Sequence, residues 1–166
     1  MNEKLFQKLL LELVKESKKH FKSELKGILL FGSTVKYLKK VTDIDLLICI
    51  DPLPEKRRKR FEIFDPVEKK LRLRLERFQK DGGFLHFSPI LRTEKEILQF
   101  SPLYLDMVDC SKILYDSKGL LRGVLKKTKE WIKKSGAYRV KKGLLWYWVL
   151  KPDAHFDQKF KMGWSD

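Results

Sequence analysis

The chain has 166 residues, the usual length of a single domain that can bury a sizeable core. Its composition, 43% hydrophobic and 36% charged, is typical of a globular protein and excludes a disordered chain. Lysine and arginine total 37 against 22 aspartate and glutamate, so the net charge is +15. This balance favours polyanionic partners, namely nucleic acid, nucleotide phosphates or an anionic surface, and the alternative is a lysine-rich surface that only faces solvent.

Membrane, secreted and zinc proteins are not favoured by the sequence. No apolar run reaches the roughly 18 to 20 residues of a membrane span, and the first residues lack the apolar region of a signal peptide. We therefore expect a cytoplasmic protein without a membrane partner. Cys49 and Cys110 do not have zinc-ligand spacing, and Cys49 lies in an apolar run where a buried thiol is expected.

The first half of the chain predicts helices and strands in turn. Helical spacing of apolar residues predicts a helix over residues 2–22, and apolar runs predict strands over residues 27–31 and 41–50. Ser33 is expected to cap one or two turns of helix over residues 34–40. After the basic stretch 56–60, a second long helix is expected to begin at Asp65, because Asp65-Pro66-Val67-Glu68 combines an N-cap, a first-turn proline and a capping-box glutamate. Asp81-Gly82-Gly83 is expected to end it.

Shorter elements are expected in the second half. A third strand is expected over residues 84–91, in which Pro89 indicates an edge or a bend, followed by a short helix capped by Thr93. A helix over 103–110, a strand over 112–116 and a helix over 120–135 ended by Gly136 come next. The last expected element is a hairpin with strands 138–140 and 144–150. Strands alternating with helices predict an α/β or α+β domain, a mixed sheet with flanking helices, over residues 1–118. Residues 119–166 are then a C-terminal extension, a helix and a basic, aromatic hairpin packed on the same domain.

Aromatic side chains are interleaved with the basic residues of this extension. We expect them to pack beneath the hairpin, and base stacking is the alternative. The basic stretch 56–60 is either a solvated loop or a nucleic-acid contact.

Two short segments combine a phosphate-binding pattern with a pair of carboxylates. Gly32 allows the backbone to approach a ligand, and Ser33 stands at a helix N-terminus, where free N–H groups and a hydroxyl favour phosphate. Asp43 and Asp45 are two residues apart on a strand, so their carboxylates project from one face. Two adjacent carboxylates repel each other unless a cation lies between them, and hard oxygen ligands suit Mg²⁺. This combination is typical of phosphoryl or nucleotidyl transfer. The alternative is a pair of solvated carboxylates at a strand end.

The segments 29–33 and 42–48 resemble the signature of the DNA polymerase beta-like nucleotidyltransferase superfamily, and are most similar to its small, stand-alone members, the minimal nucleotidyltransferases. This resemblance implies that Gly32 and Ser33 bind the triphosphate and that Asp43 and Asp45 hold the metal, Mg²⁺ or alternatively Mn²⁺. A third carboxylate on a later strand normally completes such a site. Weaker similarity to one branch of the family extends through residues 101–107, 113–116 and 148–152.

The sequence departs from that pattern at two places. Tyr37 stands where family members often have glycine, and His86 and Ser88 stand where the third carboxylate is expected to project. We treat His86 as a hydrogen-bonded sheet residue in preference to a ligand, and Asp106 as a helix-surface or capping residue. The predicted function is transfer of a nucleoside monophosphate from a nucleoside triphosphate to an acceptor. The alternative is a binding module that has lost catalysis, either an antitoxin-like subunit with a small helical partner or a nucleic-acid binder that uses its basic surface.

Overall fold

A computed structural model describes residues 3–36, 43–76, 85–143, 145–153 and 163–164. The elements in chain order are α1 (Glu3–Phe21), the 3-10 turn η1 (Lys22–Glu24), β1 (Leu25–Phe31), α2 (Ser33–Lys36), β2 (Asp43–Ile50), α3 (Arg57–Glu76), β3 (His86–Arg92), α4 (Glu94–Ile97), α5 (Leu103–Asp109), β4 (Ser111–Asp116), α6 (Leu120–Ser135), β5 (Tyr138–Lys142) and β6 (Leu145–Val149).

Four strands form a mixed sheet in the order β3-β2-β1-β4. β1 pairs antiparallel with both β2 and β4, whereas β2 and β3 run parallel. β3 is an edge strand, which is where a strand can tolerate Pro89, a residue without an N–H to donate. The expected mixed sheet with flanking helices is confirmed.

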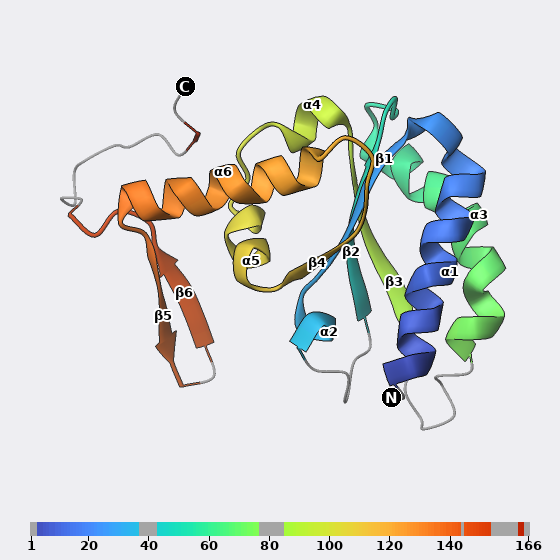
Figure 1. Cartoon of the computed structure of the whole chain (residues 1–166), viewed down its shortest axis with the longest axis horizontal. Coiled ribbons are helices and arrows are strands. Elements are labelled where there is room, and N and C mark those ends of the chain that lie inside the picture. Colours follow the sequence, from blue (N-terminus) through green and yellow to red (C-terminus); the bar gives the residue numbers. More distant parts are fainter. Residues whose placement is uncertain (1–2, 37–42, 77–84, 144, 154–162, 165–166) are drawn as a thin grey trace.

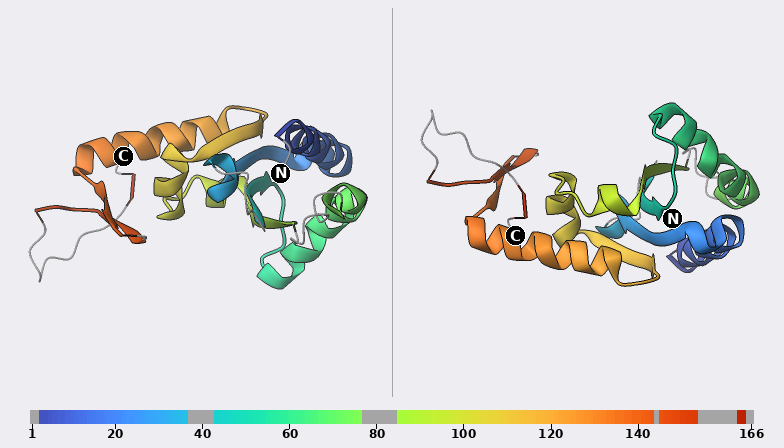
Figure 2. Two further views of the ribbon diagram at one scale, coloured as in Figure 1. Left: turned by 90° about the horizontal axis from the view of Figure 1, so that it is seen from below. Right: turned by 90° about the horizontal axis from the view of Figure 1, so that it is seen from above.

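Helices cover both faces of this sheet, as Figures 1 and 2 show. Alternate residues of β1 and β2 point to opposite faces. Ile28, Leu46 and Ile48 pack with α1 and α3, whereas Leu47 and Cys49 pack with α4, α5 and α6. The architecture is therefore three layers, with one apolar core on each side of the sheet. Cys49 is fully buried and not disulfide-bonded, as expected.

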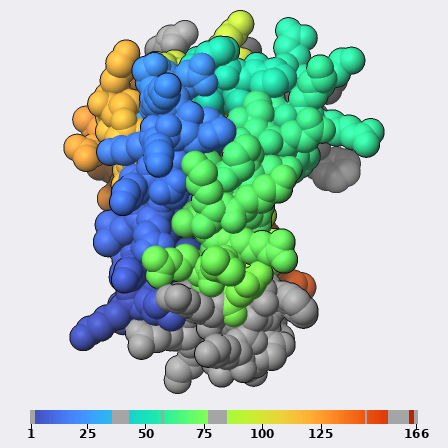
Figure 3. All heavy atoms as spheres, turned by 90° about the vertical axis from the view of Figure 1, so that its right-hand side faces the viewer, coloured from blue at the N-terminus to red at the C-terminus, as the bar shows by residue number. Residues whose placement is uncertain are grey.

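The first outer layer consists of α1 and α3, which lie side by side in Figure 3. Their apolar stripes meet over the sheet, and Leu13 and Leu71 are buried there. Two ion pairs join the helices at the surface: Arg74 Nε lies 2.8 Å from Glu12 Oε2, and Lys70 Nζ lies 3.5 Å from Glu16 Oε2.

The expected start of the second long helix at Asp65 is wrong, because α3 begins at Arg57 and contains Pro66 in its interior. Proline lacks the N–H that would bond the carbonyl four residues earlier, but tertiary contacts hold the first turns in place. Arg60 Nε donates to the carbonyl of Pro54 at 2.6 Å, and Arg60 Nη1 donates to Glu96 at 2.7 Å. Phe64 is buried in the core. The basic stretch 56–60 therefore leads into the helix and forms its first turn. The expected end at residues 81–83 lies outside the described residues.

The second outer layer consists of α4, α5 and α6. The expected capping of α4 is confirmed, because Glu96 N donates to Thr93 Oγ1 at 3.2 Å and Thr93 N donates to Glu96 Oε2 at 2.9 Å. α6 ends at Ser135 before Gly136, whose φ of 68° is a left-handed conformation that favours glycine. Among the described residues, no helix is both long and apolar enough to cross a lipid bilayer.

The hairpin β5–β6 extends from the end of α6 (Figure 1). The structure shows an arrangement different from our expectation that the tail aromatics pack beneath it. Trp131 and Trp164 pack against Phe100, with ring centroids 5.0 and 5.8 Å away. On the hairpin itself Tyr138, Trp146 and Tyr147 are exposed, because no second layer formed by described residues covers this two-stranded ribbon. Phe156 and Phe160 lie outside the described residues.

Candidate active site

A tight loop after β1 brings backbone and carboxylate together. Gly32 has a φ of +79°, and a Cβ there would overlap Asp45 Oδ2 and lie 3.2 Å from Asp45 Cγ. Only glycine meets both conditions, left-handed backbone and no side chain. The group that approaches Gly32 in the structure is the carboxylate of Asp45, and the close approach of a ligand to Gly32 stays a prediction.

Three hydrogen bonds hold this loop. The carbonyl of Gly32 accepts from Val35 N at 3.3 Å and from Cys110 Sγ at 3.4 Å, so the end of α5 contacts the loop. Thr34 is buried and donates through Oγ1 to the carbonyl of Phe31 at 3.3 Å. Ser33 is exposed and is the first residue of α2, whereas the sequence suggested that it precedes the helix. Residues 37–40 of that expected helix, with Tyr37, lie outside the described residues.

Asp43 and Asp45 lie at the start of β2, at the end of the sheet where the Gly32 loop is found. Both are half-buried, and both alternate with Ile44, which is fully buried in the core under α1 and α3. The two carboxylates therefore share the opposite sheet face, the one covered by α4, α5 and α6 further along β2. The predicted placement of the pair on one face agrees with this geometry.

The parallel pairing of β2 with β3 sets a hydrogen-bonding side chain opposite each aspartate. His86 is the register partner of Asp43, and Ser88 is the partner of Asp45. His86 Nε2 lies 2.6 Å from Asp43 Oδ1, and the Ser88 hydroxyl hydrogen-bonds the carboxylate of Asp45. The positions where a third carboxylate was sought therefore hold His86 and Ser88, each bonded to an aspartate.

The two carboxylates lie close together at this end of the sheet, so the negative charge of one disfavours ionisation of the other. Burial, and next the charge of Asp43, raise the pKa of Asp45, while Ser88 and His86 partly offset this increase. Burial and the charge of Asp65 also raise the pKa of Glu68, a carboxyl group on α3 that is close enough to His86 to interact with its charge. The sequence analysis treated Glu68 only as a capping-box residue and missed its place beside His86, because α3 and β3 are brought together only by the fold.

A divalent cation fits the character of this donor set. Carboxylate oxygens are hard ligands of the kind that Mg²⁺ prefers, and the raised pKa of Asp45 shows a carboxylate that positive charge would stabilise. Among the described residues, however, no group of three or more His, Cys, Asp or Glu side chains is arranged to hold a metal ion. The described part of the site therefore offers two protein carboxylates, and further oxygens can come from a ligand such as a phosphate or from water.

Cavities of ligand size lie along β3, and residues of α3 also line each of them. One has a volume of about 490 Å³ and is lined by His86, Glu68 and the last turns of α3. The other, of about 450 Å³, is lined by residues 88–92 of β3 with Arg60 and Phe61. His86 lines the first cavity and Ser88 the second, whereas Asp43 and Asp45 line neither of them.

Comparison with known proteins finds adenylyltransferases similar in sequence or fold. The chain is 28% identical over 137 residues to a protein of Methanocaldococcus jannaschii named "Putative protein adenylyltransferase MJ1305", covering 81% of this chain and 88% of that protein. The crystal structure of spectinomycin adenyltransferase AAD(9) from Enterococcus faecialis with ATP and spectinomycin has a TM-score of 0.52 and 16% identity, covering 76% of this chain and 67% of that chain. At this identity the likeness shows the fold alone.

A toxin-antitoxin crystal structure with AMP-PNP reaches a TM-score of 0.49 at 16% identity, covering 75% of this chain and 87% of that chain, which is too weak a likeness to support an inference. No protein-family model matches the chain. The archaeal relative and the shared fold are consistent with the resemblance of the Gly32 loop and the Asp43–Asp45 pair to the DNA polymerase beta-like nucleotidyltransferase superfamily.

Proposed function

We propose that the protein transfers AMP from ATP to a hydroxyl group of an acceptor and releases pyrophosphate. The observation that supports this most directly is the contact between the Gly32 loop and Asp45. In this contact, a backbone segment suited to binding phosphate lies beside a carboxylate suited to binding a cation. Adenine is the expected base because the archaeal relative is named an adenylyltransferase. That name also makes a side-chain hydroxyl of a protein the first acceptor to test.

In this proposal each site residue has a separate task. Gly32 and Ser33, with the N–H groups of the loop, bind the β- and γ-phosphates, and Asp43 and Asp45 hold Mg²⁺. The bound cation would neutralise phosphate charge and favour ionisation of the acceptor hydroxyl. The acceptor oxygen forms a bond to the α-phosphorus, the bond to the bridging oxygen breaks, and pyrophosphate leaves with that electron pair. The hydroxyl proton passes to solvent.

The first test is binding, because it needs no knowledge of the acceptor. Thermal melts are recorded with ATP, GTP, CTP or UTP, with and without Mg²⁺. ATP and Mg²⁺ together should stabilise the protein by about 2.7 kcal/mol at 100 times the dissociation constant, and neither should do so alone. Asp43→Asn and Asp45→Asn should remove this stabilisation, whereas Asp153→Asn, an exposed aspartate beyond β6, should keep it. An unchanged melting temperature with all four nucleotides would argue against the site.

A second candidate function is a binding module that keeps nucleotide affinity without catalysis. It is favoured by His86 and Ser88, which leave the described site with two carboxylates where transfer usually involves a third. We expect slow transfer with Mg²⁺ and faster transfer with Mn²⁺, for which an imidazole is a better ligand. Labelled ATP in a lysate of candidate acceptors measures this. Ser88→Asp or His86→Asp should raise the rate if the protein is an enzyme, and no labelling by either variant would favour the binding module.

A further inference from the structure

The hairpin β5–β6 exposes aromatic side chains that the enzyme proposal does not use. Trp146 is 48% and Tyr147 52% exposed, although indole and phenol rings usually gain stability from burial. Within the part of the chain that the structure describes, the two strands make up a sheet of their own, separate from the central one. A two-stranded hairpin is at best marginally stable in water by itself, so its exposed rings suggest a binding role.

The strand register sorts these side chains onto two faces. Cross-strand partners share a face, and the partners Arg139↔Trp148 and Lys141↔Trp146 therefore form a cation–indole face. The guanidinium of Arg139 lies 5.3 Å from the centroid of the Trp146 ring. Tyr147 alternates with these residues and lies on the opposite face. One side of the ribbon thus combines two positive charges with two indole rings.

The surroundings of this face are strongly basic. Residues 120–149, which form α6 and the hairpin, contain nine lysines and arginines and one acidic residue, Glu130. The six basic side chains of α6 are all exposed: Arg122, Lys126, Lys127, Lys129, Lys133 and Lys134. None of the ion pairs found between described residues includes one of these six. The positive charge of α6 is therefore not neutralised by those pairs, and a polyanion is its natural complement.

The cation–indole face is linked to the proposed active site. Trp148 Nε1 donates to Asp106 Oδ1 on α5 at 2.8 Å, and Cys110 after α5 donates to the Gly32 carbonyl at 3.4 Å. Asp43 and Asp45 point to the sheet face on the α5 and α6 side, and Figures 1 and 2 show the hairpin on that same side. A ligand lying along the hairpin would therefore lie on the side of the sheet that carries the aspartates.

We propose that the cation–indole face, Arg139, Lys141, Trp146 and Trp148, together with the basic surface of α6, binds single-stranded nucleic acid. Phosphates match the basic side chains, and unpaired bases can stack on Trp146. A duplex is a poorer fit, because its base faces are already stacked on each other. An acidic protein would match the charge but leave the exposed indole without a stacking partner. This proposal stands apart from the transfer of AMP, since it concerns a different surface.

Fluorescence anisotropy of the whole chain tests it, with labelled oligouridylate and oligothymidylate about 20 nucleotides long, which exceeds the roughly 4–16 nucleotides of known sites. We expect a dissociation constant of about 1–100 µM at physiological salt and tighter binding at low salt. Trp146→Ala should weaken binding about five-fold or more, and Trp146→Phe should restore most of it. Tyr147→Ala removes an equally exposed ring from the other face and should leave the affinity unchanged.

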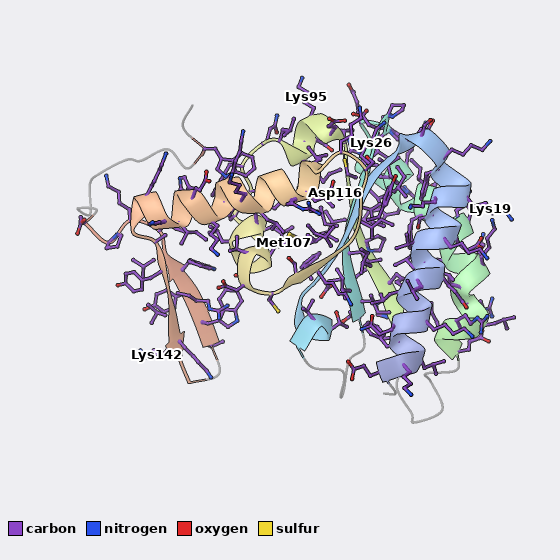
Figure 4. The ribbon with its side chains drawn as sticks, viewed as in Figure 1. Lys19, Lys26, Lys95, Met107, Asp116 and Lys142 are labelled. Carbon is purple, nitrogen blue, oxygen red and sulfur yellow. The ribbon has the colours of Figure 1, made fainter. Side chains whose placement is uncertain are left out.

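Charge reversals give a second, independent readout. Lys141→Glu should reduce the slope of log affinity against log salt by about 0.7 for each phosphate that the protein no longer neutralises. Lys19→Glu is the matched control, because Lys19 lies on α1 at the opposite side of the molecule from Lys142 at the hairpin end (Figure 4). A smaller slope only for Lys141→Glu supports the assigned surface, and equal slopes for both variants would overturn it.

Three outcomes would refute the proposal. The first is that no oligonucleotide binds at low salt, and the second is that Trp146→Ala and Tyr147→Ala weaken binding equally. The third is that polyglutamate binds as tightly as RNA does and that Trp146→Ala leaves this affinity unchanged, which would indicate an acidic protein partner. The assay contains no nucleotide or metal, and Asp43→Asn should bind the oligonucleotide normally. A negative result for oligonucleotide binding therefore does not count against the proposed transfer of AMP, and a negative result for nucleotide binding does not count against the proposed nucleic-acid surface.

Discussion

Replacing Gly32 with alanine separates the structural cost of the loop from its functional role. Alanine in the left-handed conformation that Gly32 adopts costs about 1–2 kcal/mol. The new Cβ would also overlap Asp45 Oδ2, but a carboxylate can rotate away, so this clash adds little to the free energy of folding. The melting temperature should then fall by about 2–8 °C, since 1 kcal/mol corresponds to about 2–4 °C in a chain of this length.

The displaced carboxylate should have a larger effect on ligand binding. Asp45 can no longer lie against the loop, so the cation and the phosphates lose their shared geometry. We expect Gly32→Ala to weaken binding of ATP with Mg²⁺ by about 10–100-fold, the range seen when a metal ligand loses its support. Isothermal titration calorimetry measures this directly, and urea denaturation gives the free energy of unfolding.

Gly119→Ala is the matched control. Gly119 has a φ of +73°, close to the +79° of Gly32, but a Cβ there would have no heavy atom within 4 Å. Both variants should therefore lose a similar amount of stability, and only Gly32→Ala should lose nucleotide affinity. If Gly32→Ala bound ATP and Mg²⁺ as tightly as Gly119→Ala, the contact between Gly32 and Asp45 would have no role in binding.

Further variants test the electrostatics of the fold. Asp45→Asn should raise the melting temperature of the metal-free protein at neutral pH, because the raised pKa of Asp45 means that its ionisation opposes folding. Thermal melts across a range of pH should show that this increase in melting temperature vanishes below pH 3.8, the ordinary pKa of aspartate. Arg60→Ala should cost about 2–3 kcal/mol in urea denaturation, because it leaves the half-buried Glu96 unpaired, whereas Arg72→Ala breaks an exposed pair and should cost less than about 1 kcal/mol. Burial alone would raise the pKa of Glu96, but hydrogen bonds from Arg60 and Thr93 outweigh it and lower this pKa. The stability that the Arg60–Glu96 pair contributes is therefore present above the ordinary pKa of glutamate and is lost as the pH falls through the lowered pKa. The destabilisation caused by Arg60→Ala should accordingly shrink in acid.

Local signals in the sequence were sufficient for most elements of the fold. The capping box of Thr93 and Glu96 and the glycine after Ser135 act through neighbouring residues, so the start of α4 and the bounds of α6 could be predicted. α3 shows where such signals fail. Pro66 and Asp65 have the pattern of a helix start, but the contacts of Arg60 with distant residues extend the helix about two turns further back, at about 3.6 residues per turn.

The site was predictable in its parts and not in its contacts. Apolar runs placed the aspartate pair at the start of one strand and Gly32 at the end of another. Their meeting depends on the antiparallel register that pairs Phe31 with Asp45, which no local signal specifies. The exposure of the hairpin rings was missed for a similar reason, since the sequence shows apolar residues but not whether a second layer exists to cover them.

The hydrogen bonds from β3 suggest how nucleotide and cation would bind. Without a cation, Asp43 lies 2.6 Å from the imidazole of His86, and Asp45 accepts from Ser88. A carboxylate at either position on β3 would add a third negative charge to this end of the sheet, where Asp45 already has a raised pKa. Side chains without negative charge hydrogen-bond the aspartates instead, so a cation would compete with His86 for Asp43. If the pair holds a cation as proposed, two protein ligands would give weak affinity for the cation alone, and the phosphates of ATP would supply further oxygens. Under that proposal we expect coupled binding of ATP and the cation in preference to a preformed metal centre.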